Sequence, residues 1–121
     1  MKRVLVVGLG NEIMGDDCIG LLVSRKLRDE LEEVDVIEWP FSPISLIDIV
    51  AEYDEVFIID SFESDKAGEV RILNPGENYS ISTHYSGVPT LIRVASSLGV
   101  KFHVIGIGVR NVSMGEECQK S

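Results

Sequence analysis

Three separate stretches of this sequence hold the residues best suited to chemistry. Asp16 and Asp17 follow a glycine-rich turn near the N-terminus, and Asp60 ends an apolar run. His84 lies in a polar stretch rich in Ser and Thr. Two carboxylates and an imidazole are a typical ligand set for borderline divalent ions such as nickel, zinc or iron(II). The residue types therefore indicate a metal site made of Asp17, Asp60 and His84, if the fold brings them together.

Each of these residues also has a simpler role when it is considered alone. Asp16 suits a helix N-cap, and Asp17 suits the first helical turn, where the helix dipole favours an ionised carboxylate. Asp60 can cap a turn, although a charge directly after four apolar residues needs a partner. His84 alone is more often a hydrogen-bonded loop residue than a ligand. The metal site is therefore a prediction about the combination.

The other reactive or aromatic side chains give weaker indications. His103 lies inside an apolar run, which predicts a structural role, and Cys18 is expected to pack a helix. Cys18 and Cys118 form neither a CxxC pair nor a regular framework, which favours a reducing cytoplasm. Trp39 and Phe41 fit either the core or an exposed rim for a peptide partner.

The elements that must position these residues alternate between strand and helix patterns. Compact or alternating apolar runs predict strands, and apolar spacing on one face predicts helices. The strands are expected at 3–8, 34–39, 55–60, 69–73 and 102–109, and the helices at 18–32, 43–50 and 88–98, the last closed by Gly99.

This alternation predicts an α/β fold: a three-layer α/β/α sandwich with a mostly parallel central sheet of about five strands. We expect one domain over residues 1–121. Ligands of such sheets bind beyond the carboxyl ends of the strands, where all three stretches fall.

Charge and length exclude several classes of protein. The 121 residues carry 11 Lys and Arg against 20 Asp and Glu, a net charge of −9. This balance argues against general nucleic-acid binding and against docking on anionic membranes. The apolar run at the N-terminus is too short for a signal peptide, and no segment approaches the length of a membrane span. We therefore expect a cytoplasmic protein.

Two other functions compete with a metal site. Gly8 and Gly10 follow a strand, as in a nucleotide-binding α/β module, but Ile13 occupies the third glycine position and the following acids would repel phosphate. A receiver-like phosphoacceptor signalling domain also has paired acids and a later aspartate. However, Asp16 and Asp17 come well after the first strand, and Lys101 precedes the last strand instead of ending it.

The first of the three stretches resembles the opening motif of a known family. Residues 8–20 read G-x-G-N-x-x-M-G-D-D-x-x-G, which is similar to the hydrogenase maturation peptidases. An acid after an apolar strand (Asp60) and a histidine in a Ser/Thr-rich loop (His84) follow in the same order. The similarity runs from about Val4 to Val109. The glycine-rich turn that is usual after the second strand is replaced by WPFSP at 39–43.

The resemblance implies a nickel-dependent endopeptidase. Such enzymes remove the C-terminal extension of the large-subunit precursor of nickel–iron hydrogenases after nickel insertion. It implies that Asp17, Asp60 and His84 contact the nickel and form the catalytic site, with the nickel carried by the precursor and no organic cofactor. The implied partner is that precursor, with no nucleic acid and no membrane.

Overall fold

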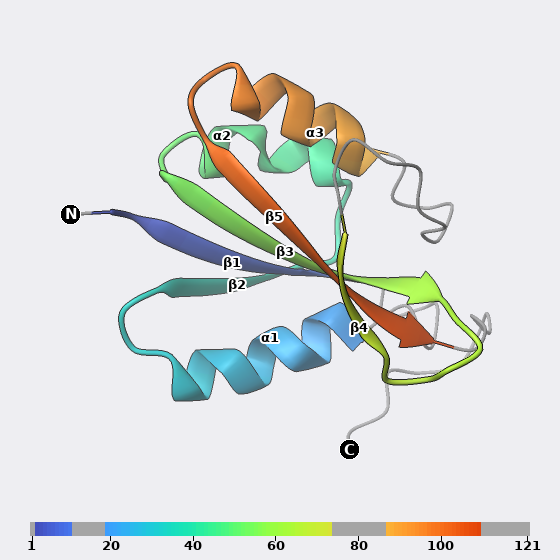
Figure 1. Ribbon diagram of the computed structural model, residues 1–121. Coiled ribbons are helices and arrows are strands. Elements are labelled where there is room, and N and C mark those ends of the chain that lie inside the picture. The colour runs from blue at the N-terminus through green and yellow to red at the C-terminus, as the bar shows by residue number, and fades with distance from the viewer. Residues whose placement is uncertain (1, 11–18, 74–86, 110–121) are drawn as a thin grey trace.

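The computed structural model describes residues 2–10, 19–73 and 87–109, which form a twisted sheet with helices on both faces (Figure 1). The sheet has five strands in the order β2-β1-β3-β5-β4. All pairings are parallel except that of β4 with β5. In chain order the elements are β1 (Val4–Leu9), α1 (Ile19–Glu30), β2 (Asp35–Trp39), the 3-10 helix η2 (Pro43–Leu46), α2 (Ile47–Val50), β3 (Glu55–Glu63), β4 (Val70–Leu73), α3 (Gly87–Ser96) and β5 (Lys101–Val109).

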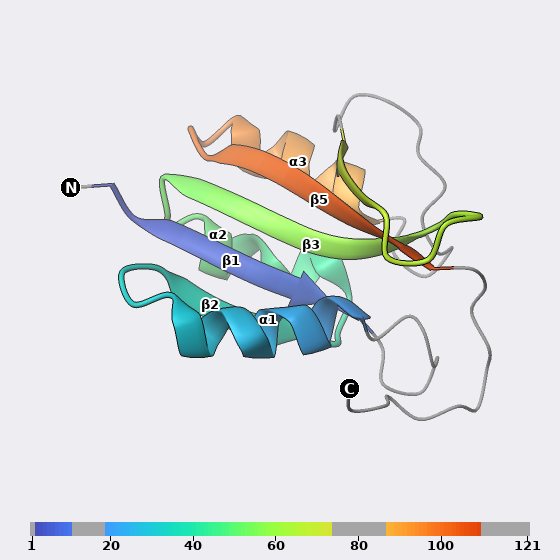
Figure 2. The same ribbon diagram turned by 60° about the horizontal axis from the view of Figure 1, so that its bottom comes forward.

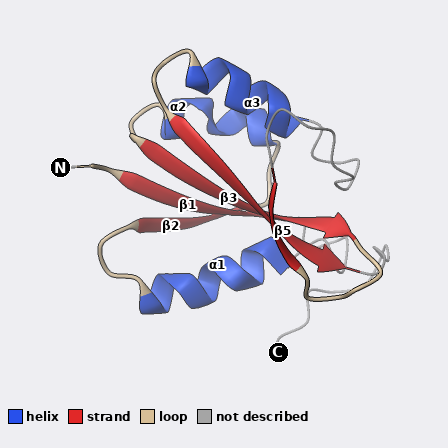
Figure 3. Ribbon diagram, in the orientation of Figure 1, coloured by secondary structure: helices blue, strands red, loops and turns tan. Residues whose placement is uncertain are grey.

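The helices divide into two layers (Figures 1 and 3). Helix α1 covers one face of the sheet over β2, β1 and β3, while η2, α2 and α3 pack together on the opposite face. The main apolar core fills the α2–α3 side, and its fully buried members include Leu5, Val7, Ile58, Leu91 and Val104. The predicted three-layer sandwich with a mostly parallel sheet is confirmed.

Most predicted elements are confirmed, but the end of the third strand was predicted wrongly. Strand β3 continues three residues beyond Asp60, and Ser61 pairs with Ile107 of β5. The continuation depends on a partner strand that lies more than forty residues away in the sequence, so no local pattern signals it. Asp60 is therefore a residue inside a strand.

Two glycines allow α1 to lie unusually close to the sheet. A Cβ atom on Gly8 would come within 2.1 Å of the Gly20 carbonyl oxygen and 2.5 Å of the Ser24 hydroxyl. A Cβ atom on Gly20 would come within 2.7 Å of the Ile59 carbonyl oxygen. Because neither glycine has a side chain, the start of α1 rests directly on the backbones of β1 and β3.

Helix α3 ends in a Schellman motif, as the position of Gly99 predicts. Gly99 has a φ of +94°. The Gly99 N–H donates to the Ser96 carbonyl (3.0 Å), and the Val100 N–H donates to the Ala95 carbonyl (3.2 Å). These two bonds satisfy carbonyls at the helix end and turn the chain into β5.

The sheet face that carries α1 is covered unevenly. Among the described elements, α1 packs on β2, β1 and β3, and no described helix packs on the same face of β5 and β4. Val70 and Ile72 of β4 are 63% and 76% exposed. Figure 2 shows β4 at the border of the sheet, away from α1. An apolar strip is therefore open to solvent on the described part of this face.

Candidate functional site

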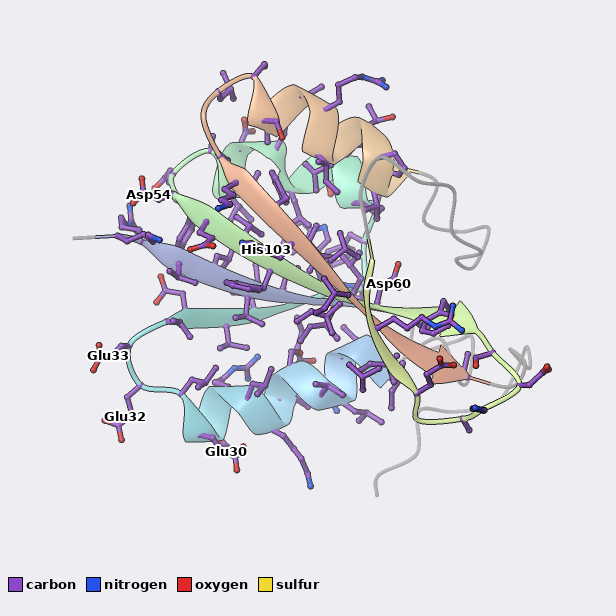
Figure 4. All side chains as sticks on the ribbon, in the orientation of Figure 1. Glu30, Glu32, Glu33, Asp54, Asp60 and His103 are labelled. Atoms are coloured by element: carbon purple, nitrogen blue, oxygen red, sulfur yellow. The ribbon has the colours of Figure 1, made fainter. Side chains whose placement is uncertain are left out.

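A buried aspartate, Asp60, lies inside β3 at the level where the neighbouring strands β1 and β2 end (Figure 4). The Asp60 side chain is 0% exposed, and its Oδ1 accepts a hydrogen bond from the Ser61 backbone N–H at 2.8 Å. An ionised carboxylate in such a place needs hydrogen bonds or a cation to compensate for lost hydration. Asp60 is therefore a strong candidate for a functional group.

A row of residues crosses the sheet at the level of Asp60. Trp39 pairs with Leu9, and Asp60 pairs with Gly106, which in turn pairs with Arg71. The row is continuous because Gly8 of β1 pairs with Ile59 of β3, so the residues that follow them, Leu9 and Asp60, also lie side by side. Neighbouring strands lie about 4.8 Å apart, so Trp39 and Arg71 each lie about 10 Å from Asp60 along the row. Their side chains share one face because directly paired residues point to the same side.

Helix α1 begins against the backbone of β3 next to Asp60, on the sheet face opposite to the Asp60 side chain, and Asp17 comes shortly before it in the sequence. The start of α1 is fixed by the approach of Gly20 to the Ile59 carbonyl, one residue before Asp60. Asp17 lies outside the described residues. It precedes Gly20 by three residues, and three residues of chain span at most about 11 Å.

Helix α3 begins at the same edge, and His84 comes shortly before it. A Cβ atom on Gly87 would lie 3.6 Å from the Ile44 nitrogen and 3.8 Å from Pro43 Cβ, so α3 starts against η2. His84 also lies outside the described residues and precedes Gly87 by three residues. The predicted site therefore has one member in the described structure, Asp60, and two that stay predictions.

Within the ranges 2–10, 19–73 and 87–109, no cluster of three or more His, Cys, Asp or Glu side chains is placed to hold a metal ion. The only predicted metal ligand in these ranges is Asp60. The predicted site therefore requires residues from the 11–18 and 74–86 segments, as the sequence pattern implies. Asp16, Cys18 and Cys118 also lie outside the described residues.

Glu38 shows that the second strand does not carry a nucleotide-binding acid. Its carboxylate forms salt bridges with Arg25 (2.9 Å) and Arg28 (3.1 Å) of α1. Burial raises the pKa of Glu38, but the hydrogen bonds and charges of the two arginines outweigh it, so the pKa lies below its usual value of 4.5. Glu38 is bound to two arginines of α1, and the space beside Gly8 is occupied by the Gly20 carbonyl. Neither residue is therefore available to bind a dinucleotide.

Arg71 is a residue that sequence reasoning missed. It lies on the same row as Asp60 with only Gly106 between them. Its guanidinium stacks over the Phe62 ring at 4.8 Å, and its Nε donates to Glu69 Oε2 at 2.8 Å. No local signal could have found it, because the placement depends on the antiparallel register of β4.

His103 has the structural role that its position predicts. It stacks on Phe57 with ring centroids 4.5 Å apart, and its Nε2 lies 2.5 Å from Glu55 Oε2. Lys2 also binds Glu55, at 3.2 Å. This cluster lies at the amino end of the sheet, away from Asp60 (Figure 4).

The fold matches solved structures of one class of enzyme. The crystal structure of the [NiFe] hydrogenase maturation protease HycI from Thermococcus kodakarensis KOD1 superposes with a TM-score of 0.83 and 24% identity, covering 98% of this chain and 81% of that one. HybD from Thermococcus kodakarensis, also a [NiFe] hydrogenase maturation protease, gives a TM-score of 0.70 and 27% identity, covering 98% and 87%. A receiver-like domain is not favoured, because its strand order is 2-1-3-4-5 whereas β4 here is antiparallel and outside β5.

Sequence comparison gives the family. The model of the hydrogenase maturation protease family matches residues 19–120. A Methanocaldococcus jannaschii protein, provisionally named a hydrogenase maturation protease, is 30% identical over 123 residues, covering 90% of this chain and 72% of that protein. The chain belongs to the hydrogenase maturation protease family, and its enzyme class is therefore that of a peptidase, as the motif at residues 8–20 predicted.

Proposed function

We propose that this protein cleaves the C-terminal extension from the large-subunit precursor of a nickel–iron hydrogenase after nickel has been inserted. The observation that carries the proposal is the buried Asp60 inside β3, at the level where β1 and β2 end. Helix α1 begins against the backbone of β3 next to Asp60, and α3 begins against η2, which follows β2. Asp17 and His84 precede those two helices by a few residues each. Asp17 lies within about 11 Å of chain from Gly20, which meets the β3 backbone next to Asp60.

In this proposal the nickel arrives as part of the substrate. Asp17, Asp60 and His84 complete its coordination and so position the scissile bond beside the enzyme. A precursor without nickel cannot be held in this way, which makes metal insertion a checkpoint for cleavage. Nickel or one of the two carboxylates activates the attacking water; a carboxylate would do so as a general base.

Burial explains why Asp60 suits this role. A fully buried carboxylate has a fixed orientation, because the Ser61 N–H holds one of its oxygens. A carboxylate that is held in this way can bind a nickel ion brought by the precursor. The Asp60 carboxylate is therefore already oriented before the substrate binds.

The decisive test is mass spectrometry of a nickel-loaded hydrogenase large-subunit precursor incubated with the protein. We expect loss of the C-terminal extension with the wild type and none with a nickel-free precursor. Efficient cleavage of the nickel-free precursor would disprove the checkpoint.

His84→Ala should abolish processing while the fold is retained, as judged by circular dichroism. The matched control is His103→Gln, which changes the chain's other histidine, on the opposite face of the sheet from Asp60, and should leave cleavage intact. Normal cleavage by His84→Ala would remove His84 from the site.

Asp60→Asn should also abolish processing, because the amide has the same shape but no charge with which to bind a cation. The Ser61 N–H can still donate to the amide oxygen, and circular dichroism checks that the variant is folded. If Asp60→Asn processes the nickel-loaded precursor at the wild-type rate, Asp60 does not contact the metal.

The proposed place of action is the cytoplasm, which the cysteine pattern favours. No described helix is long and apolar enough to span a membrane.

A further inference from the structure

A short aromatic segment, residues 39–44, runs from the last residue of β2 into η2. Phe41 is 61% exposed and Ile44 is 39% exposed. The Phe41 ring meets the Trp39 ring edge to face, with centroids 5.2 Å apart and an angle of 82°. Trp39 is partly buried and packs against the main core, so the Phe41 ring rests on a side chain that is itself held in place. Phe41 therefore presents an exposed apolar ring that rests on a second aromatic ring at this end of β2.

The aromatic segment is held in a defined conformation. Trp39 Nε1 donates to the Ser42 carbonyl at 3.1 Å and to the Ser45 hydroxyl at 3.2 Å. The Ser45 hydroxyl donates to the same carbonyl at 2.5 Å. Pro43 is buried and begins η2. Because these contacts fix the backbone on both sides of Phe41, its exposure is built into the fold and costs little ordering entropy on binding.

The position of this segment relates it to the proposed site. Trp39 lies on the same row and the same sheet face as Asp60, about 10 Å away across β1. Pro43 and Ile44 contact the start of α3 at Gly87, three residues after His84. The aromatic segment thus borders the space between Asp60 and the helix to which His84 leads.

We propose that Phe41, supported by Trp39, forms an apolar subsite that receives an apolar side chain of the hydrogenase precursor beside the bond to be cleaved. This inference rests on the proposed function. The partner is an extended peptide segment, because a single ring beside a cleavage site can bury one side chain but offers too little area for a folded domain. The subsite makes Phe41 a specificity-determining residue of this chain.

The first test compares the kinetics of three variants on a nickel-loaded precursor. Phe41→Ala should raise KM about tenfold with kcat nearly unchanged, because the lost contact is made equally in the ground and transition states. Phe41→Leu should recover most of the affinity. The matched control is Leu98→Ala at the far end of α3, since Leu98 is 62% exposed and should leave KM unchanged.

A second comparison identifies the side chain that the subsite receives. Apolar residues on each side of the cleaved bond of the precursor are replaced by Ser, one at a time. One of these precursors should bind the wild type about tenfold more weakly. The affinity of that precursor should not fall further when Phe41 is replaced by Ala, as expected for two groups that contact each other. If the effects of Phe41→Ala and of every Ser replacement are additive, the subsite is disproved.

A binding measurement separates this inference from the proposed function. Trp39 is the only tryptophan of the chain, so its emission can be followed during titration with a Trp-free synthetic peptide that spans the cleavage region. Weaker binding by Phe41→Ala, without cleavage of any precursor by the wild type, would keep the subsite and disprove the function. Cleavage with unchanged KM and peptide affinity in Phe41→Ala would disprove the subsite and keep the function. A Phe41→Ala change that only shifts a dimer to monomer in sedimentation also disproves the subsite.

Discussion

At the scale of single residues, glycines decide where the site can form. Gly8 and Gly20 belong to the motif at residues 8–20, and the sequence suggested a turn or a weak nucleotide-binding pattern for Gly8. The structure shows instead that both permit backbone contact between α1 and the sheet. This contact depends on tertiary packing, so the local sequence pattern cannot predict it.

Gly8→Ala should destabilise the protein by about 2 kcal/mol or more, because the added methyl group would collide with the Gly20 carbonyl and force backbone shifts. Gly87→Ala is the matched control, since its methyl group would have only ordinary contacts at 3.6–3.8 Å. Urea unfolding followed by circular dichroism measures both. Equal stability of the Gly8 variant and the wild type would show that α1 can move away from the sheet without loss.

At the scale of elements, sequence predicted the type of nearly every helix and strand but not the length of β3. Strand pairs such as β3 with β5 are long-range, so residues after Asp60 join the sheet only once β5 is in place. The C-terminal end of α3 was predicted well, because a glycine at that position is a local signal.

Gly99→Ala should destabilise the protein by about 1 kcal/mol, because a side chain disfavours the left-handed conformation at φ +94°. No neighbouring atom would touch the added methyl group, so the loss reports conformation alone. Gly99→Asn should lose less, since asparagine tolerates this region. Thermal unfolding of the two variants gives the comparison, and an alanine variant as stable as the wild type would contradict the expected strain.

At the scale of the whole molecule, the fold class followed from the sequence, whereas the site followed only in part. Alternating apolar patterns are enough to specify an α/β sandwich. Asp60 lies at the level where β1 and β2 end, although β3 itself continues beyond it. Asp17 and His84 lie outside the described residues, so their convergence on Asp60 stays a prediction. Arg71 and the exposed Phe41 depend on strand register and on the packing of η2, which no local pattern specifies.

The stability of the molecule should fall in acid because several carboxylates have lowered pKa values. The pKa of Glu55 lies below 4.5 because His103 and Lys2 hydrogen-bond to its carboxylate. The pKa of Glu69 is lowered by the Ser64 hydroxyl and by Arg71. Since the unfolded chain has the higher pKa, it binds more protons in acid. The stabilisation is therefore complete above about pH 4.5 and is lost as the pH falls through the lower pKa of the folded state.

Glu55→Gln should make this loss shallower, because one proton-linked group has been removed. Urea unfolding midpoints measured from about pH 7 down to about pH 3 give the slope for both proteins. A variant with the same slope as the wild type would show that Glu55 does not contribute to the acid sensitivity.

The border strand β4 has a consequence for handling the protein. Its outer backbone groups pair with no other described strand, and Val70 and Ile72 stand out beside them. A strand of this kind can add to its counterpart in another molecule and begin aggregation. The net charge of −9 opposes such encounters by mutual repulsion. Concentrated samples should therefore stay clear longest in mildly alkaline buffer of low ionic strength, and turn cloudy first when acid or salt weakens that repulsion.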